Sequence, residues 1–176
     1  MSKADDQPSL AAQAQLALSA SDAVAAIANG SLGAADYMHT LLAQARAQAG
    51  LNSLITLNAE AALDAAARVD AARAAGHALP PLAGLPIVVK DNIDARGMPT
   101  TAGTPALRDW HPATNAPSVQ RLLDAGAIIL GKANLHELAF GATSTNFSSF
   151  AGHVKNPYDS ARIPGGSSGG TAAALA

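Results

Sequence analysis

The chain has 176 residues, of which 49% are hydrophobic but only 3% aromatic, and its formal net charge is −2. That length suits a single domain with its own core, and the slightly negative charge argues against an electrostatic grip on nucleic acid or on an anionic membrane surface. Because the chain has no cysteine, disulfides, thiolate metal ligands and a cysteine nucleophile are excluded, and covalent chemistry would have to use oxygen or nitrogen.

The beginning of the chain has no targeting pattern. Residues 1–18 lack a basic segment joined to a continuous apolar stretch, and no window of the sequence reaches the roughly 18 apolar residues that span a bilayer. We therefore expect a cytoplasmic protein that binds neither membranes nor nucleic acid, with a disordered start over residues 1–8.

Two helices are predicted next. Ser21 precedes an apolar run that Gly30 closes, which predicts a short helix over residues 23–28. Ser31 can cap a second helix, in which apolar residues recur at helical spacing until the chain reaches Gly50.

A strand and a long helix follow. Residues 51–57 have the apolar pattern of a strand. Residues 59–75 are rich in alanine and predict a helix that carries Arg68, Asp70 and Arg73 on its solvent-facing side.

From residue 79 onward the pattern changes to strands and loops. The β-branched run 87–90 predicts a buried strand, residues 117–125 a helix and residues 127–130 a second buried strand. Asn134 can cap a short helix that continues to residue 140, and residues 141–164 have the composition of a long loop. Helices that alternate with buried strands predict an α/β fold.

We expect one domain with two regions. Residues 1–78 would be mainly helical scaffold, and residues 79–176 would hold the strands, the loops and a Ser/Gly-rich motif.

That motif, residues 164–171 (PGGSSGGT), packs two serines among four glycines and leads into a helix-forming run. Glycine lets backbone N–H groups approach a ligand closely, and a following helix adds its own unpaired N–H groups. The pattern predicts a catalytic or anion-holding loop, with a flexible linker as the alternative. Because only six residues follow Gly170, we also expect the sequence to be part of a larger protein.

Two other motifs do not indicate nucleotide or metal sites. Residues 126–132 have the spacing of a phosphate-binding loop, but Ala133 stands where a hydroxyl would bind magnesium. His136 and Glu137 open a zinc-protease pattern, but Phe140 occupies the position of the second histidine. We expect neither a cofactor nor a metal.

Lys90 ends the first predicted buried strand and precedes three polar residues, Asp91, Asn92 and Asp94, which could orient an amine. An exposed surface lysine is the plain alternative. Burial would lower the pKa of Lys90 from about 10.4 and free its amine to act as a base. Beside Ser167, such an amine would form a Ser–Lys arrangement.

Four separated motifs occur in one order: residues 84–92 (GLPIVVKDN), 131–134 (GKAN), 156–157 (NP) and 164–170 (PGGSSGG). In order and spacing they resemble the amidase signature family, over about residues 79–176 and more weakly over the helical N-terminal part. The resemblance implies a mixed, twisted β-sheet covered by α-helices, of which this chain would supply about the first third. It also implies a serine hydrolase of C–N amide bonds that needs no cofactor.

The resemblance assigns roles to single residues. Lys90 matches the family's base, and Ser167 matches the serine that follows a cis peptide bond and relays a proton between the lysine and a nucleophilic serine. Ser168 would act through backbone hydrogen bonds, and Lys132 corresponds to a family lysine outside this triad. The nucleophile and the oxyanion hole lie roughly two dozen residues beyond the relay serine. Only nine residues follow Ser167 here, so we expect this chain alone to be inactive.

Within the family, residues 136–144 look most similar to hydrolases of the indoleacetamide and mandelamide type. This implies a small carboxamide substrate whose acyl group is lined by residues 140–146. Two alternatives stay open: a fragment of the A subunit of a glutamyl-tRNA amidotransferase, which has the same triad, and a non-catalytic binding fragment. A partial sheet with unpaired edges would also make the chain prone to aggregation or to self-association as a homo-oligomer.

Overall fold

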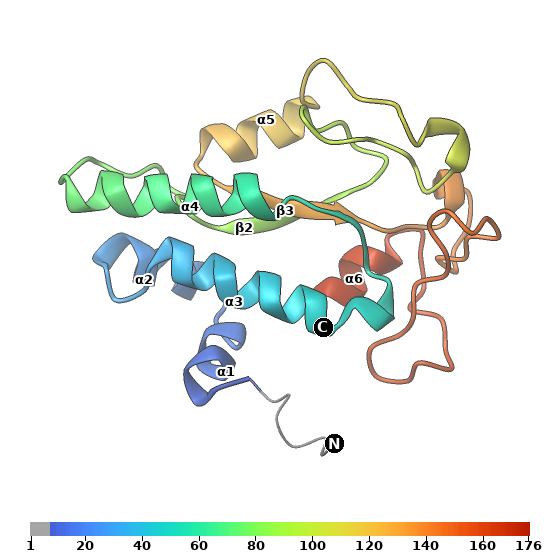
Figure 1. Ribbon diagram of the computed structural model, residues 1–176, viewed down its shortest axis with the longest axis horizontal. Coiled ribbons are helices and arrows are strands. Elements are labelled where there is room, and N and C mark those ends of the chain that lie inside the picture. The colour runs from blue at the N-terminus through green and yellow to red at the C-terminus, as the bar shows by residue number, and fades with distance from the viewer. Residues whose placement is uncertain (1–7) are drawn as a thin grey trace.

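The computed structural model describes residues 8–176 and shows helices around a three-stranded sheet (Figure 1). The strand order is β1 (Leu54–Leu57), β3 (Ile128–Ala133) and β2 (Pro86–Lys90). Strand β1 runs antiparallel to β3, and β2 runs parallel to it. The predicted α/β class with a mixed sheet is therefore confirmed. The predicted disordered start lies, except for Pro8, outside the described residues.

Six α-helices and three short 3₁₀ turns complete the described part of the chain. They are α1 (Leu10–Leu16), α2 (Ala20–Asn29), α3 (Ala34–Ala47), α4 (Ala59–Ala74), α5 (Pro117–Asp124) and α6 (Gly169–Leu175), with 3₁₀ turns at Ala49–Leu51, Pro105–Leu107 and Glu137–Ala139.

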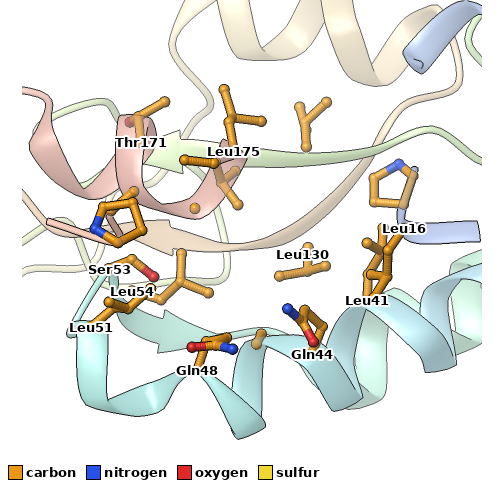
Figure 2. A pocket seen from close by; sticks show the side chains of 18 of the residues that line it. Leu16, Leu41, Gln44, Gln48, Leu51, Ser53, Leu54, Leu130, Thr171 and Leu175 are labelled. Atoms are coloured by element: carbon orange, nitrogen blue, oxygen red, sulfur yellow. The ribbon is translucent and has the colours of Figure 1, made fainter. Parts of the chain in front are cut away.

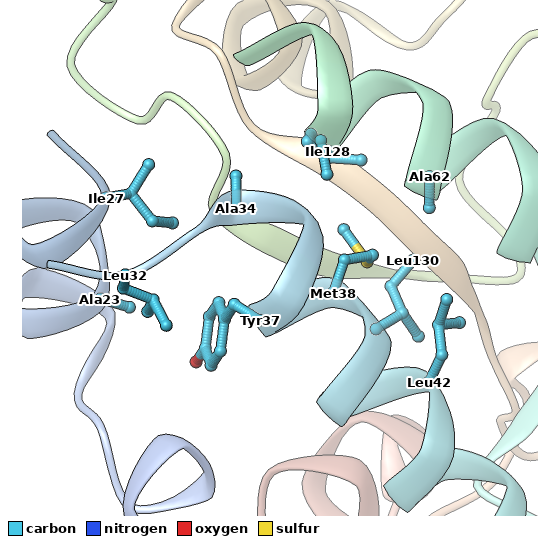
Figure 3. Close-up of a cluster of buried hydrophobic side chains, with 11 residues drawn as sticks. Ala23, Ile27, Leu32, Ala34, Tyr37, Met38, Leu42, Ala62, Ile128 and Leu130 are labelled. Carbon is cyan, nitrogen blue, oxygen red and sulfur yellow. The ribbon is translucent and has the colours of Figure 1, made fainter. Parts of the chain in front are cut away.

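Strand β3 is buried along its whole length and divides the core in two. Ile128 and Leu130 point into a cluster formed by α2, α3 and α4, where Met38 and Leu42 of α3 are almost completely covered (Figure 3). Ile129, between them, belongs to a second cluster with side chains of β2 and α5. This alternation is what a central strand requires, because successive side chains point to opposite faces of a sheet.

The first two long helices begin at residues other than those predicted. Helix α2 starts at Ala20, because the hydroxyl of Ser19, and not that of Ser21, accepts from the N–H of Asp22 at 3.1 Å. The predicted cap of the next helix at Ser31 is wrong as well. Helix α3 starts at Ala34, after a Gly33 that forms no side-chain cap.

The missing cap of α3 comes from α4. The carboxylate of Asp70 accepts from the N–H groups of Ala34 and Ala35 at 2.9 and 3.0 Å. Arg73 contacts Asp70 at 3.1 Å and donates to the carbonyl of Ile27, in the last turn of α2, and to that of Leu32, in the connection to α3. Asp70 and Arg73 are therefore half-buried and link α4 to α2 and α3, so their predicted position on the solvent-facing side of the helix is wrong. Arg68 is exposed, as predicted.

Three further boundaries differ from the sequence predictions. Strand β3 continues past residue 130 to Ala133, and β1 is limited to Leu54–Leu57. The predicted short helix that ends at Phe140 is only the 3₁₀ turn Glu137–Ala139, because the side chain of Asn134 bonds to carbonyls of other loops and does not cap a helix.

Within residues 8–176, no single helix has the length and apolar character needed to cross a membrane. The pair α1 and α2 passes that test only when the two are taken together, and they meet at an angle of 117°.

Candidate active site

The structure brings Lys90 and Ser167 together, although 77 residues separate them in the sequence. Lys90 is the last residue of β2, and Ser167 lies in the glycine-rich turn just before α6. The Nζ of Lys90 donates to the Oγ of Ser167 at 2.7 Å. The peptide bond between Gly166 and Ser167 is cis. Both side chains are half-buried, so the contact is only partly shielded from water.

Backbone hydrogen bonds fix the turn that carries Ser167. The carbonyl of Ser167 accepts from the N–H of His136 at 3.0 Å, and the N–H of Gly170 donates to the carbonyl of Asn134 at 3.1 Å. Asn134 and His136 directly follow β3, so the central strand of the sheet sets the position of the turn.

Burial lowers the pKa of Lys90 below its ordinary value of 10.5. Within the described part of the chain, no carboxylate forms an ion pair with this amine to oppose that shift. A lysine in this situation loses its proton more readily than one in water, and its neutral amine can accept a proton from a neighbouring hydroxyl.

The three polar residues after Lys90 do not orient its amine, contrary to the sequence prediction. Asp91 turns to Lys132, whose Nζ lies 3.1 Å from a carboxylate oxygen of Asp91, and both side chains are fully buried. Asn92 is exposed. Asp94 uses its backbone carbonyl to accept from the N–H of Ala116.

Lys132 lies apart from Ser167 because of the sheet register. Lys132 pairs with Val89, and Lys90 pairs with the next residue of β3, Ala133. Lys90 and Lys132 therefore point to opposite faces of the sheet. Burial lowers the pKa of Lys132, and the charge of Asp91 opposes this shift. The amine of Lys132 also donates to the carbonyl of Pro99 and to the hydroxyl of Thr100, at 3.0 and 2.9 Å.

Ser168 is exposed, and its hydroxyl does not cap α6. Its carbonyl accepts from the N–H of Ala172 in the first turn of that helix.

Residues 141–164, which were predicted only as a loop, contain buried polar side chains that the sequence did not predict. Ser144 is completely covered and contacts the glycine-rich turn. Asn146 is also buried, and its amide donates to the carbonyls of Leu135 and Gly152. The density of Ser, Thr and Asn in this segment was the available signal, because small polar residues can bond to backbone groups inside a folded loop.

A groove of about 650 Å³ lies on the same face of the sheet as α3 and α6, but Lys90 and Ser167 do not line it. Figure 2 shows Thr171 and Leu175 of α6 on one side, Leu41 of α3 on the other and Leu130 between them. Its lining is mainly apolar and includes the polar side chains of Gln44, Gln48 and Ser53.

In the part of the chain that the structure describes, no three His, Asp or Glu side chains gather closely enough to hold a metal ion. At the Lys90–Ser167 contact, the amine and the hydroxyl lie close enough to exchange a proton.

Comparisons with known proteins relate the chain to enzymes that act on amides. Residues 36–176 match the family described as Amidase. The A subunit of the glutamyl-tRNA(Gln) amidotransferase of Salinispora arenicola is 46% identical over 160 residues, which cover 90% of this chain and 32% of that relative. The chain thus spans about a third of the length of this curated relative.

Solved structures give the same relationship. The peptide amidase from Stenotrophomonas maltophilia is 36% identical, with a TM-score of 0.79, and the match covers 88% of this chain and 33% of that one. A structure described as a vestigial protein complex that reveals the evolutionary origins of an s-triazine catabolic enzyme is 41% identical, with a TM-score of 0.80. That match covers 87% of this chain and 34% of the other.

Proposed function

We propose a function for the full-length protein from one established premise: this chain belongs to the amidase family. The full-length protein is proposed to hydrolyse the C–N bond of a small carboxamide to the acid and ammonia. The contact between Lys90 and Ser167 carries the proposal: their Nζ and Oγ atoms lie 2.7 Å apart, and burial lowers the pKa of the amine. A serine with a lysine as its base is a known form of the nucleophile-and-base arrangement.

In this mechanism Lys90 and Ser167 move protons. Neutral Lys90 takes the proton of the Ser167 hydroxyl, while Ser167 takes the proton of a nucleophilic serine, whose oxygen bonds to the amide carbon. When the C–N bond breaks, the proton returns along the same path to the leaving nitrogen, and ammonia departs from an acyl ester. Water then attacks the ester carbon while its proton passes to Lys90 by the same route; the C–O bond to the serine breaks, the proton returns to the serine oxygen, and the acid is released.

Residues 1–176 alone are proposed to be inactive. The resemblance places the nucleophile roughly two dozen residues beyond Ser167, together with the oxyanion hole, and the last serine in this sequence is Ser168. Removal of a single oxyanion-hole donor already costs about 100-fold or more in kcat. Without the nucleophile as well, we expect no turnover.

For the substrate we propose an arylacetamide, such as an indoleacetamide or a mandelamide. The segment proposed to line the acyl pocket, residues 140–146, passes beside the glycine-rich turn: a Cβ added to Gly166 would lie 2.8 Å from Ser144 and 3.1 Å from Ala142. Phe140 is 92% exposed and offers an aromatic surface next to this segment. Exchange of residues 140–146 for those of a relative with another preference should change the preferred acyl group; an unchanged preference would contradict this assignment.

One alternative has a specific observation in its favour. The Salinispora arenicola relative is named as a component of a glutamyl-tRNA(Gln) amidotransferase. If this chain belongs to such an assembly, the ammonia would come from a carboxamide donor and would be used by a partner. Copurification of the full-length protein with tRNA and a second subunit would support this alternative, and efficient hydrolysis by the isolated protein would argue against it.

The test of the proposed function is ammonia release by the full-length protein from phenylacetamide, mandelamide and glutamine. Lys90→Ala should lower kcat by about 1,000-fold or more, because the base is lost. Lys155→Ala, which removes an exposed lysine, is the matched control and should leave kcat unchanged. Turnover by Lys90→Ala at the wild-type rate would overturn the proposal.

The pH dependence gives a second readout. The neutral amine is the active form, so kcat/KM should rise with pH through the pKa of Lys90. Because burial lowers that pKa, the rise should be centred below 10.5. A profile that falls over this range would show that the protonated amine is the active form.

A further inference from the structure

Ser144 touches the turn that carries Ser167. Its side chain is fully buried. The hydroxyl of Ser144 accepts from the N–H of Gly169 at 2.9 Å and donates to the carbonyl of Ser167 at 3.5 Å. The hydroxyl of Ser144 thus contacts the backbone of Ser167 itself and that of Gly169, two residues later.

Two glycines of the turn, Gly166 and Gly169, allow it to pack closely against Ser144. A Cβ added to Gly169 would overlap the Oγ of Ser144, and one added to Gly166 would lie 2.8 Å from that same oxygen. Separations this short do not occur for real Cβ atoms, so the turn can approach Ser144 only because both positions lack a side chain.

Ser144 is itself held in place. Its backbone has a φ of 54°, in the left-handed region that few residues with a side chain adopt. Its carbonyl accepts from the N–H of Val154 at 3.2 Å. The hydroxyl therefore reaches the turn from a loop that is fixed at a second point.

We infer that Ser144 is a positioning residue that holds the Ser167 hydroxyl within reach of the Lys90 amine; this inference rests on the proposed function. The N–H of His136 donates to the carbonyl of Ser167 at 3.0 Å, and the hydroxyl of Ser144 donates to the same carbonyl at 3.5 Å and accepts from the N–H of Gly169 at 2.9 Å. The Ser144 hydroxyl forms its hydrogen bonds with backbone groups of the turn and none with the Lys90 amine or the Ser167 hydroxyl, so it acts through the backbone.

A positioning role affects the rate of proton transfer more than it affects substrate binding. A displacement of a reacting group by about 1 Å can cost about 100-fold in rate. Although Ser144 belongs to the segment proposed to line the acyl pocket, its hydroxyl is fully buried against the glycine-rich turn and does not reach a substrate. Its removal should therefore lower kcat by about 10-fold to 100-fold and leave KM within about twofold.

The experiment compares three variants of the full-length protein. Ser144→Ala removes the hydroxyl, and Ser144→Gly removes it while relaxing the left-handed backbone, so a loss common to both variants is not due to strain. Ser148→Ala is the matched control, because the Ser148 hydroxyl is also buried but has no hydrogen-bond partner within the described residues. Circular dichroism confirms that each variant is folded.

Steady-state kinetics on phenylacetamide and amide hydrogen exchange around Gly169 are then measured. Both Ser144 variants should lose kcat and exchange the Gly169 amide about 5-fold to 10-fold faster, since one hydrogen bond is worth about 1 kcal/mol. Ser148→Ala should match the wild type. An active protein whose Ser144 variants keep the wild-type kcat overturns this inference alone. A full-length wild type without amidase activity overturns the proposed function itself.

Discussion

Lys90 and Lys132 stand near the ends of neighbouring strands, yet they have different surroundings. Lys90 contacts a hydroxyl at the edge of the sheet, where a neutral amine can take up a proton. Lys132 is fully buried against Asp91, and its charge is matched inside the protein. Lys132 pairs with Val89, the residue before Lys90, and successive side chains of a strand point to opposite faces of the sheet. The two amines therefore lie on opposite faces, and only that of Lys90 contacts Ser167.

The Asp91–Lys132 pair should matter for stability, because removal of one partner leaves a buried charge without compensation. Lys132→Met should lower the free energy of unfolding by about 3–5 kcal/mol. The double variant Asp91→Asn/Lys132→Met should lose less than the sum of the two single variants. Urea denaturation measures each value. The exposed pair Arg162–Asp159 is the control, and Arg162→Met should cost less than about 1 kcal/mol; equal losses at both pairs would contradict this account.

For single residues, the sequence predicts which side chains form the site better than it predicts which other residues they contact. The motifs around Lys90 and Ser167 were enough to expect their contact, and the structure places them together. The residue that Asp91 contacts was not predicted, because Lys132 reaches it only through the pairing of two strands. Ser144 was missed because the many small polar residues of its segment indicate a folded loop without showing which of their side chains is buried, and its contacts are with the distant residues Ser167 and Gly169.

At the scale of elements, α6 is the part whose position determines the site. The helix begins two residues after Ser167 and touches all three strands. The apolar runs predicted the positions of β2 and β3, but only the central strand β3 is fully buried, as a continuous apolar run indicates. Strand β2 was predicted to be buried and is instead an edge strand in which only Val89 is buried. Helix starts were predicted less well, since α3 takes its cap from Asp70 of another helix, and no local pattern records a cap that comes from a distant residue.

Gly170 should be essential for the docking of α6. A Cβ at this position would overlap the carbonyls of Asn134 and Ser53, both of which are backbone groups that cannot move aside easily. Gly170→Ala should therefore destabilise the protein by about 3 kcal/mol in urea denaturation. Gly50→Ala is the matched control: its Cβ would meet nothing within 4 Å, and we expect a change below about 0.5 kcal/mol. Equal stability of the two variants would show that α6 can shift without cost.

At the scale of the whole molecule, the 176 residues leave the apolar groove between α3 and α6 open (Figure 2). Leu175 lines it and is 81% exposed. Open apolar surface of this kind promotes association, because water is released when two such faces meet. The unpaired edges of β1 and β2 act in the same direction.

We therefore expect the 176-residue chain to self-associate through this groove as its concentration rises. Leu175→Gln should weaken the association, because it places a polar amide in the interface. Leu10→Gln is the matched control, since Leu10 is 85% exposed but does not line the groove. Sedimentation velocity over a range of concentrations, together with binding of a dye that reports apolar surface, measures both effects. A chain that stays monomeric and binds no dye, or an equal response to the two substitutions, would show that the groove does not drive association.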